Sequence, residues 1–191
     1  MFINKLNKKE NIEFPRQETE GYCAPGCVAV LVFLFNPEIK VDQKELAKQV
    51  KNFESWGTTN EELVQMLKNY FQEVVIEEGI TWERMKKLLQ EEYVAVIDFM
   101  DNTFYCDDSE SKSEGHSVVI IDVDQKNKSV AIIDPTNKEK CLKFRGVNYR
   151  IYNKISWVPM DWIDEQWWDL DVNEKEIRRV AIFAKLNSFK F

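Results

Sequence analysis

The hydrophobic pattern of this 191-residue chain changes near Tyr93, and this change limits the possible folds more than any other feature. Before Tyr93, apolar residues recur at the spacing of three to four that is typical of helices. After it come short apolar runs separated by polar turns, which is the pattern of strands. Helices followed by mostly antiparallel strands make an α+β fold, and the length favours one domain spanning residues 1–191.

Four helices are expected before the change. Cys23–Phe35 is predicted to be a buried helix, because Ala, Val, Leu and Phe dominate it. Suitable N-cap residues precede three further helical patterns, at Asp42, Thr59 and Thr81. Glu62 follows Thr59 by three positions, which is the spacing of a capping box.

Five strands are expected in the second half: Tyr93–Met100, His116–Val123, Ser129–Asp134, Cys141–Phe144 and Arg178–Leu186. The acidic, Ser-rich segment Asp101–Glu114 is expected to be a loop. A short turn joins the second and third of these strands, so they are predicted to pair as a hairpin. His116 at the start of one strand and Asp134 at the end of the other then lie at the same end of the hairpin.

Composition excludes several classes of function. The formal charge of −7 and the isoelectric point of about 5.0 disfavour a nucleic-acid partner, because phosphate contacts need clustered Lys and Arg. The first residues lack the apolar stretch of a signal peptide, and the apolar run Val28–Phe35 is too short to span a bilayer. We therefore expect a cytoplasmic protein without a membrane partner, and we leave its oligomeric state open.

The chain has four cysteines, Cys23, Cys27, Cys106 and Cys141, and in a reducing compartment they are expected to be thiols. Together with the single histidine, His116, they suggest a zinc site as one alternative. Structural zinc sites usually show two close pairs of cysteines, and only Cys23 and Cys27 are close here. We therefore expect no metal and no cofactor. Cys27 follows Cys23 by one helical turn in an apolar stretch, so it is predicted to be a core residue.

Four polar residues occur in an order that suits thiol chemistry. Cys23 is a useful nucleophile only as a thiolate, and His116 titrates near neutrality and can act as its base. A carboxylate such as Asp134 can hold the imidazole in the correct tautomer. Gln17, which five residues separate from Cys23, carries an amide that can donate to an oxyanion. A position at the N-terminus of its helix would further favour the thiolate of Cys23.

Structural interpretations compete with these assignments. Asp122 and Asp124 are rival carboxylates for orienting His116. Asp124 is expected in the turn, and Asp122 lies several residues along the strand of His116, too far to reach its ring. Asp134 could simply end its strand before a proline turn. Gln17 could be no more than a polar surface residue.

Several segments together resemble the papain-like peptidase domains that process bacteriocin precursors at double-glycine leaders, and their stand-alone relatives. In the order of that family, they are Gln17–Cys23, Cys23–Val30, Gly57–Leu63, and Gly115–Ile121 with Ala131–Pro135. The resemblance spans roughly residues 15 to 136 and implies a papain-like fold, with the nucleophile helix packed on the sheet. The chain departs from the family pattern at Ala24, where Gly is usual, and at Gly26, where Ala is usual.

The resemblance implies that Cys23 is the nucleophile, His116 the base, Asp134 the orienting carboxylate and Gln17 the oxyanion donor. It does not carry over bacteriocin export or double-glycine specificity, because the membrane and ATPase parts of the family have no counterpart here. The predicted function is hydrolysis of a peptide or amide substrate by a cysteine peptidase. Acyl transfer by the same residues, and a non-catalytic peptide-binding or scaffold domain, remain alternatives.

Two further segments keep open interpretations. The Trp-rich stretch Trp157–Trp168 could line a binding groove, but such aromatics more often form core or an oligomer interface. The acidic segment Asp107–Glu110 precedes His116 and could border the cleft, where it would favour basic substrates.

Overall fold

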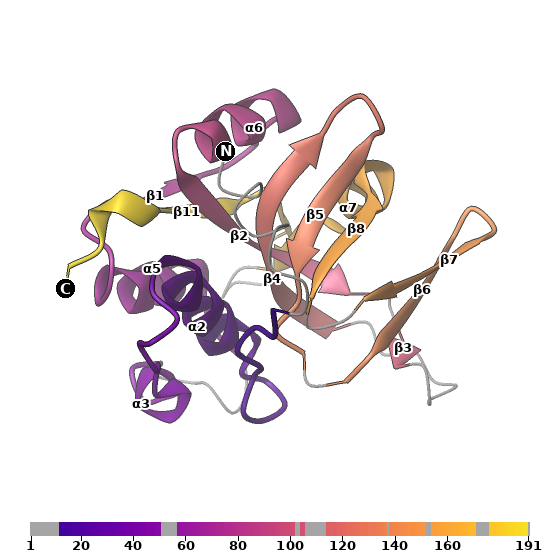
Figure 1. The fold of residues 1–191 in the computed structure, drawn as a ribbon. Helices are drawn as coiled ribbons and strands as arrows, with labels where there is room; N and C mark the ends of the chain where they lie inside the picture. Colours follow the sequence, from indigo (N-terminus) through magenta and orange to yellow (C-terminus); the bar gives the residue numbers. More distant parts are fainter. Residues whose placement is uncertain are drawn as a thin grey trace.

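A six-stranded antiparallel sheet forms the centre of the computed structural model (Figure 1). The structure describes residues 12–50, 57–101, 104–105, 114–136, 138–151, 154–170 and 176–190. From edge to edge, the strands are β1 (Val74–Glu77), β11 (Ala181–Lys185), β2 (Tyr93–Asp101), β4 (Glu114–Asp124), β5 (Ser129–Ile133) and β8 (Ile155–Pro159). The α+β class predicted from the sequence is confirmed.

Helices cover both faces of this sheet. On one face lie α2 (Cys23–Phe35) and α5 (Asn60–Lys68), with α3 (Gln43–Ala47) packed against α2, and on the other face lie α6 (Trp82–Gln90) and α7 (Met160–Gln166) (Figure 1). Neighbouring residues of one strand therefore enter different cores. Val94 and Val96 pack with α2, whereas Ala95 and Ile97 pack with α6. Because both faces are buried, the strands read as continuous apolar runs rather than alternating ones.

The predicted helix starts are confirmed. Asp42, Thr59 and Thr81 each accept a hydrogen bond from a backbone N–H in the first turn of the following helix, and Glu62 completes a capping box with Thr59. The helix predicted at Cys23–Phe35 has those bounds, and most of its residues are buried all round. An all-apolar helix of this kind is expected to lie inside the fold.

The structure adds elements that the sequence pattern did not indicate. They are β1, α7, β8, a hairpin of β9 (Trp168–Leu170) and β10 (Glu176–Arg178), and the strands β3 (Phe104–Tyr105) and β7 (Val147–Ile151). The strand predicted at Cys141–Phe144 is present as β6 (Lys140–Phe144), and it pairs with β3 and β7 in a separate three-stranded sheet. The expected loop Asp101–Glu114 thus contains strand β3, while its acidic part, Asp107–Glu110, lies outside the described residues. The expected last strand is interrupted because Arg179 adopts a left-handed backbone with φ of 54°.

The Trp-rich segment contributes chiefly to the core. Trp162 and Trp167 are 3% and 1% exposed and pack in the core beneath α6 and α7, whereas Trp157 on edge strand β8 is 42% exposed. The indole of Trp167 donates to the carbonyl of Val180 at 2.9 Å, and its ring centroid lies 5.2 Å from that of Trp82. The segment therefore ties α7 to β11 and α6.

The expectation that all four cysteines are thiols is wrong for Cys141, which is disulfide-bonded. Cys23 and Cys27 are free, and Cys106 lies outside the described residues. Disulfides are rare in reducing compartments, so this bond does not support the expectation of a cytoplasmic protein, which was based on the lack of a signal peptide and of a spanning apolar run. In the part of the chain that the structure describes, no helix is long and apolar enough to cross a membrane.

Candidate active site

Cys23 is the first residue of α2, where the backbone N–H groups of the first turn have no partner inside the helix. These N–H groups and the helix dipole favour a negative charge, so the position stabilises a thiolate. The Cys23 side chain is partly exposed, whereas Cys27, one turn later, is fully buried. The helix start thus holds one cysteine at the edge of the core and the other inside it.

His116 and Asp134 come together at one end of the β4–β5 hairpin. The Nε2 atom of His116 lies 2.9 Å from Oδ1 of Asp134, and the two side chains are only 11% and 2% exposed. The backbone N–H of Thr136 donates to the same carboxylate oxygen at 2.8 Å. Nζ of Lys140, from strand β6, lies 3.3 Å from the other carboxylate oxygen. Asp134 is thus held from three sides. Because Nε2 of His116 is bonded to Asp134, the other ring nitrogen, Nδ1, is left for the hydrogen bond with Cys23.

The electrostatics of the site favour a thiolate–imidazolium pair. Burial by itself would raise the pKa of the Cys23 thiol, but the hydrogen bond and charge of His116 bring it below its ordinary value. Burial would lower the pKa of His116, but the charge of Asp134 and its hydrogen bond raise it to about 10. Burial would likewise raise the pKa of the Asp134 carboxyl, which His116 and Lys140 instead hold well below its usual range.

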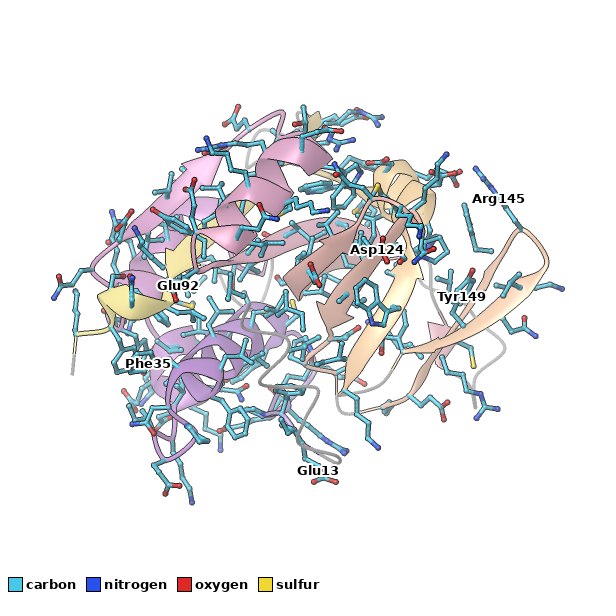
Figure 2. The ribbon with its side chains drawn as sticks, turned by 45° about the horizontal axis from the view of Figure 1, so that its top comes forward. Glu13, Phe35, Glu92, Asp124, Arg145 and Tyr149 are labelled. Atoms are coloured by element: carbon cyan, nitrogen blue, oxygen red, sulfur yellow. The ribbon has the colours of Figure 1, made fainter. Side chains whose placement is uncertain are left out.

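The rival residues have other roles. Burial, and then the negative charge of Cys23, raise the pKa of the Cys27 thiol well above its ordinary value, so Cys27 remains protonated. Asp122 accepts the backbone N–H of Val123 at 2.8 Å. Asp124 accepts two backbone N–H groups in the β4–β5 turn, at the tip of the hairpin (Figure 2). Among the candidate carboxylates, Asp134 is therefore the one that the structure pairs with His116.

Gln17 is not a surface residue, since it is only 6% exposed. Its backbone N–H donates to the carbonyl of Pro135 at 2.7 Å, directly after Asp134 in the chain. Its side-chain Nε2 donates to the carbonyl of Thr19 at 3.1 Å, while Oε1 has no partner among the described residues. The structure thus places Gln17 beside the segment that carries the carboxylate, and the bond to Thr19 uses one of the two hydrogens on Nε2.

Two residues near Cys23 were missed by the sequence analysis. The hydroxyl of Ser117 lies 3.6 Å from the sulfur of Cys23 and donates to the carboxylate of Asp98, its cross-strand neighbour. The negative charge of Asp98 raises the pKa of Cys23, and the hydroxyl of Ser117 lowers it. A signal was present, because Asp98 is the only charged residue in the apolar run Tyr93–Met100.

An aromatic contact supports the histidine from the other side. The rings of Phe99 and His116 meet edge to face, with centroids 5.9 Å apart, and Trp162 of α7 packs on Phe99 in the same way at 5.6 Å. Edge-to-face pairs of this kind favour a defined ring orientation. In the described part of the chain, no group of three or more His, Cys, Asp and Glu side chains could hold a metal ion.

Comparison with known proteins gives information on the family and the fold of the chain. The model of a family described as the Peptidase C39 like family matches residues 9–161. No curated protein matches the chain. Among solved structures, the chain resembles a crystal structure described as a presumed C39-like peptidase from Bacillus anthracis. The two are 18% identical, the match covers 91% of this chain and 94% of the other, and the TM-score is 0.53, so the likeness concerns the fold.

Proposed function

We propose, from the premise that the chain belongs to the Peptidase C39 like family, that it hydrolyses peptide or amide bonds as a cysteine peptidase. The observation that carries the proposal is the position of buried His116, which is bonded to Asp134 and pairs with Cys23. A binding module has no need of a depressed thiol pKa beside a histidine–carboxylate pair. Perturbed titrations that arise from specific partners are typical of catalytic groups.

In the proposed reaction, the thiolate of Cys23 attacks the scissile carbonyl carbon and forms a tetrahedral intermediate. The amide of Gln17 and the backbone N–H of Cys23 donate to its oxyanion. Protonated His116 gives its proton to the leaving amine, and the C–N bond breaks to leave a thioester on Cys23. His116 then takes a proton from a water molecule, which attacks the thioester and releases the acid. Asp134 keeps the imidazole oriented throughout.

The proposal is tested by exposing the purified protein to a library of peptides and identifying new peptide ends by mass spectrometry. Wild-type protein is expected to produce cleavage that disappears in Cys23→Ala and persists in Cys27→Ala, because only Cys23 carries a reactive thiolate. Both variants are checked for folding by circular dichroism. Cleavage that survives in folded Cys23→Ala would contradict the assignment.

The same experiment separates hydrolysis from acyl transfer. The thioester on Cys23 can react with an amine instead of water, so the library is also incubated with an excess of glycine amide. Products that end in a free acid, with little glycine amide incorporated, are expected for a hydrolase. Products that carry mainly glycine amide would assign the chain to acyl transfer. If no product of either kind forms, the non-catalytic alternative is correct.

A further inference from the structure

We infer that Gln43 is a positioning residue, which holds the segment around Gln17 so that the Gln17 amide meets the oxyanion. The inference rests on the function proposed above. Gln43 is the first residue of α3, and it is only 3% exposed although its side chain is polar. Burying an amide costs free energy unless hydrogen bonds compensate, so the partners of this side chain indicate its role.

Both ends of the Gln43 amide bind the backbone on either side of Gln17. Its Nε2 donates to the carbonyl of Arg16 at 2.7 Å, and its Oε1 accepts the N–H of Glu18 at 3.1 Å. In an extended chain, the carbonyl before a residue and the N–H after it point to the same side. One side chain therefore replaces the neighbouring strand that this segment lacks.

The opposite edge of the segment is also held. The N–H of Gln17 donates to the carbonyl of Pro135 at 2.7 Å, on the side away from Gln43. Residues 12–22 form no helix or strand of their own, so these three backbone bonds take the place of regular structure there. The bond to Pro135 fixes Gln17 relative to Asp134, and the bonds to Gln43 fix it relative to α3.

Close packing connects this segment to the nucleophile helix. A Cβ atom on Gly26 would lie 2.8 Å from Cβ of Pro135 and 3.3 Å from Cβ of Gln17, so α2 approaches both residues without a side chain between them. Leu46 and Ala47 anchor α3, and Leu46 packs in the core that contains α2. Gln43 therefore relates the position of Gln17 to that of Cys23.

The test compares steady-state kinetics of Gln43→Ala and Gln43→Leu with wild type, on a peptide that the library screen shows to be cleaved. For each variant kcat is expected to fall on the order of 10–10²-fold, with KM within about twofold, because a misplaced donor weakens binding of the transition state only. Affinity for a peptide aldehyde of the same sequence, which forms a tetrahedral adduct, should fall in parallel. Alkylation of Cys23 by iodoacetamide needs no oxyanion donor and should keep its rate.

A double variant distinguishes an effect of Gln43 through Gln17 from a general structural effect of Gln43. If Gln43 acts through Gln17, Gln17→Ala/Gln43→Ala should be no slower than Gln17→Ala alone. Gln49→Ala is the matched control, since Gln49 is an exposed glutamine just after α3 whose Oε1 accepts a bond from Asn69 at 3.0 Å. Its kcat should equal that of wild type.

The possible results are distinguishable. Three results would overturn the role of Gln43 while the proposed function stands. They are an unchanged kcat in Gln43→Ala, losses of kcat that multiply in the double variant, and a rate of Cys23 alkylation that falls together with kcat. Thermal unfolding of every variant identifies the temperatures at which all are folded, and the kinetics are measured there. If wild-type protein shows no cleavage that depends on Cys23, the proposed function fails and the inference fails with it.

Discussion

At the scale of single residues, two thiols in the same helix have opposite properties. Cys23 and Cys27 are four positions apart, yet the pKa of one lies below its ordinary value and that of the other far above it. Burial raises both, and the difference comes from His116, which contacts only the first. The lowered pKa of Cys23 therefore depends on a contact between elements and not on its position in the helix alone.

The pH dependence of alkylation follows from this contact. The pKa of the Cys23 thiol lies below its ordinary value of 9.0. Because iodoacetamide reacts with the thiolate, the alkylation rate should reach half of its maximum at a pH below 9.0. Replacing His116 by Gln removes the largest lowering causes and leaves burial, so the midpoint should move upward. The rates are measured by mass spectrometry in a Cys27→Ala background.

A variant that is expected to move the midpoint of the alkylation rate in the opposite direction serves as the control for that prediction. The negative charge of Asp98 raises the pKa of Cys23, so Asp98→Asn should move the midpoint to lower pH. If the His116 and Asp98 variants moved the midpoint in the same direction, or neither moved it, the electrostatic account of the site would be wrong.

At the scale of elements, the junction between α2 and the end of β5 depends on the absence of one side chain. Gly26 lets the helix approach Pro135 and Gln17 directly, and this gives a physical reason for its departure from the residue that is usual in the resembling family. The neighbouring departure, Ala24, is buried at 2% exposure. A small residue in α2 thus sets the distance between the two halves of the candidate site.

Gly26→Ala should therefore be harmful although Ala is the better helix former. Its Cβ would meet Cβ of Pro135 at 2.8 Å, and neither atom is at the end of a flexible side chain, so the backbone must move. We expect a loss of about 1–3 kcal/mol in the free energy of unfolding, typical of overpacking, and a lower kcat. Urea unfolding and steady-state kinetics measure both. A variant as stable and as active as wild type would show that the junction can relax.

At the scale of the whole molecule, a segment near the C-terminus is built into the sheet between two strands from the middle of the chain. Strand β11 pairs with both β1 and β2, so a segment near the C-terminus lies inside the sheet and not at its edge (Figure 1). The 3₁₀ turn Leu186–Ser188 follows, and the ring of Phe189 stacks on that of Phe35 at 4.2 Å. The family match ends at residue 161, yet the sheet depends on residues beyond it.

Truncation after residue 175 should accordingly abolish folding. It removes β11, exposes the edges of β1 and β2, and deletes Phe183, which is fully buried. Soluble expression and circular dichroism of the truncated chain test this. Removing only residue 191 should leave the unfolding temperature unchanged within about 1 °C, since the sheet remains complete. A folded, active 1–175 chain would contradict the importance of β11.

The pH dependence of stability is also a property of the whole fold. The pKa of His116 is raised to about 10, so its stabilising contribution is complete below about pH 6.5 and is lost as the pH rises through 10. The pKa of Asp134 is lowered, so its contribution is present above about pH 4 and is lost as the pH falls.

Asp134→Asn should therefore cost most between about pH 4 and 6.5, where the stabilising contributions of both groups are complete. We expect up to about 3–5 kcal/mol in that range, the usual cost of breaking a buried pair, and a smaller cost at pH 10.5. Urea unfolding of both proteins at pH 6 and pH 10.5 measures the difference. A cost that is equal at the two values would mean that the pair does not titrate as described.

Features that depend on near neighbours in the chain could be predicted from the pattern of residues. Helix caps at Asp42, Thr59 and Thr81 involve bonds over three positions, so the pattern of residue types was sufficient. The α+β class followed from hydrophobic spacing, which reports how each segment is buried. Cys23 and His116 could be selected because few residue types perform thiol chemistry and the chain has one histidine.

Contacts between residues far apart in the chain could be seen only in the folded molecule. Gln43 binds a segment about 25 positions away, Ser117 lies beside a cysteine 94 positions away, and Lys140 reaches Asp134 from a different sheet. None of these contacts leaves a periodic signal, because each depends on where whole elements pack. The insertion of β11 between β1 and β2 is of the same kind, since strand order follows from the burial of both sheet faces and not from the sequence of any one strand.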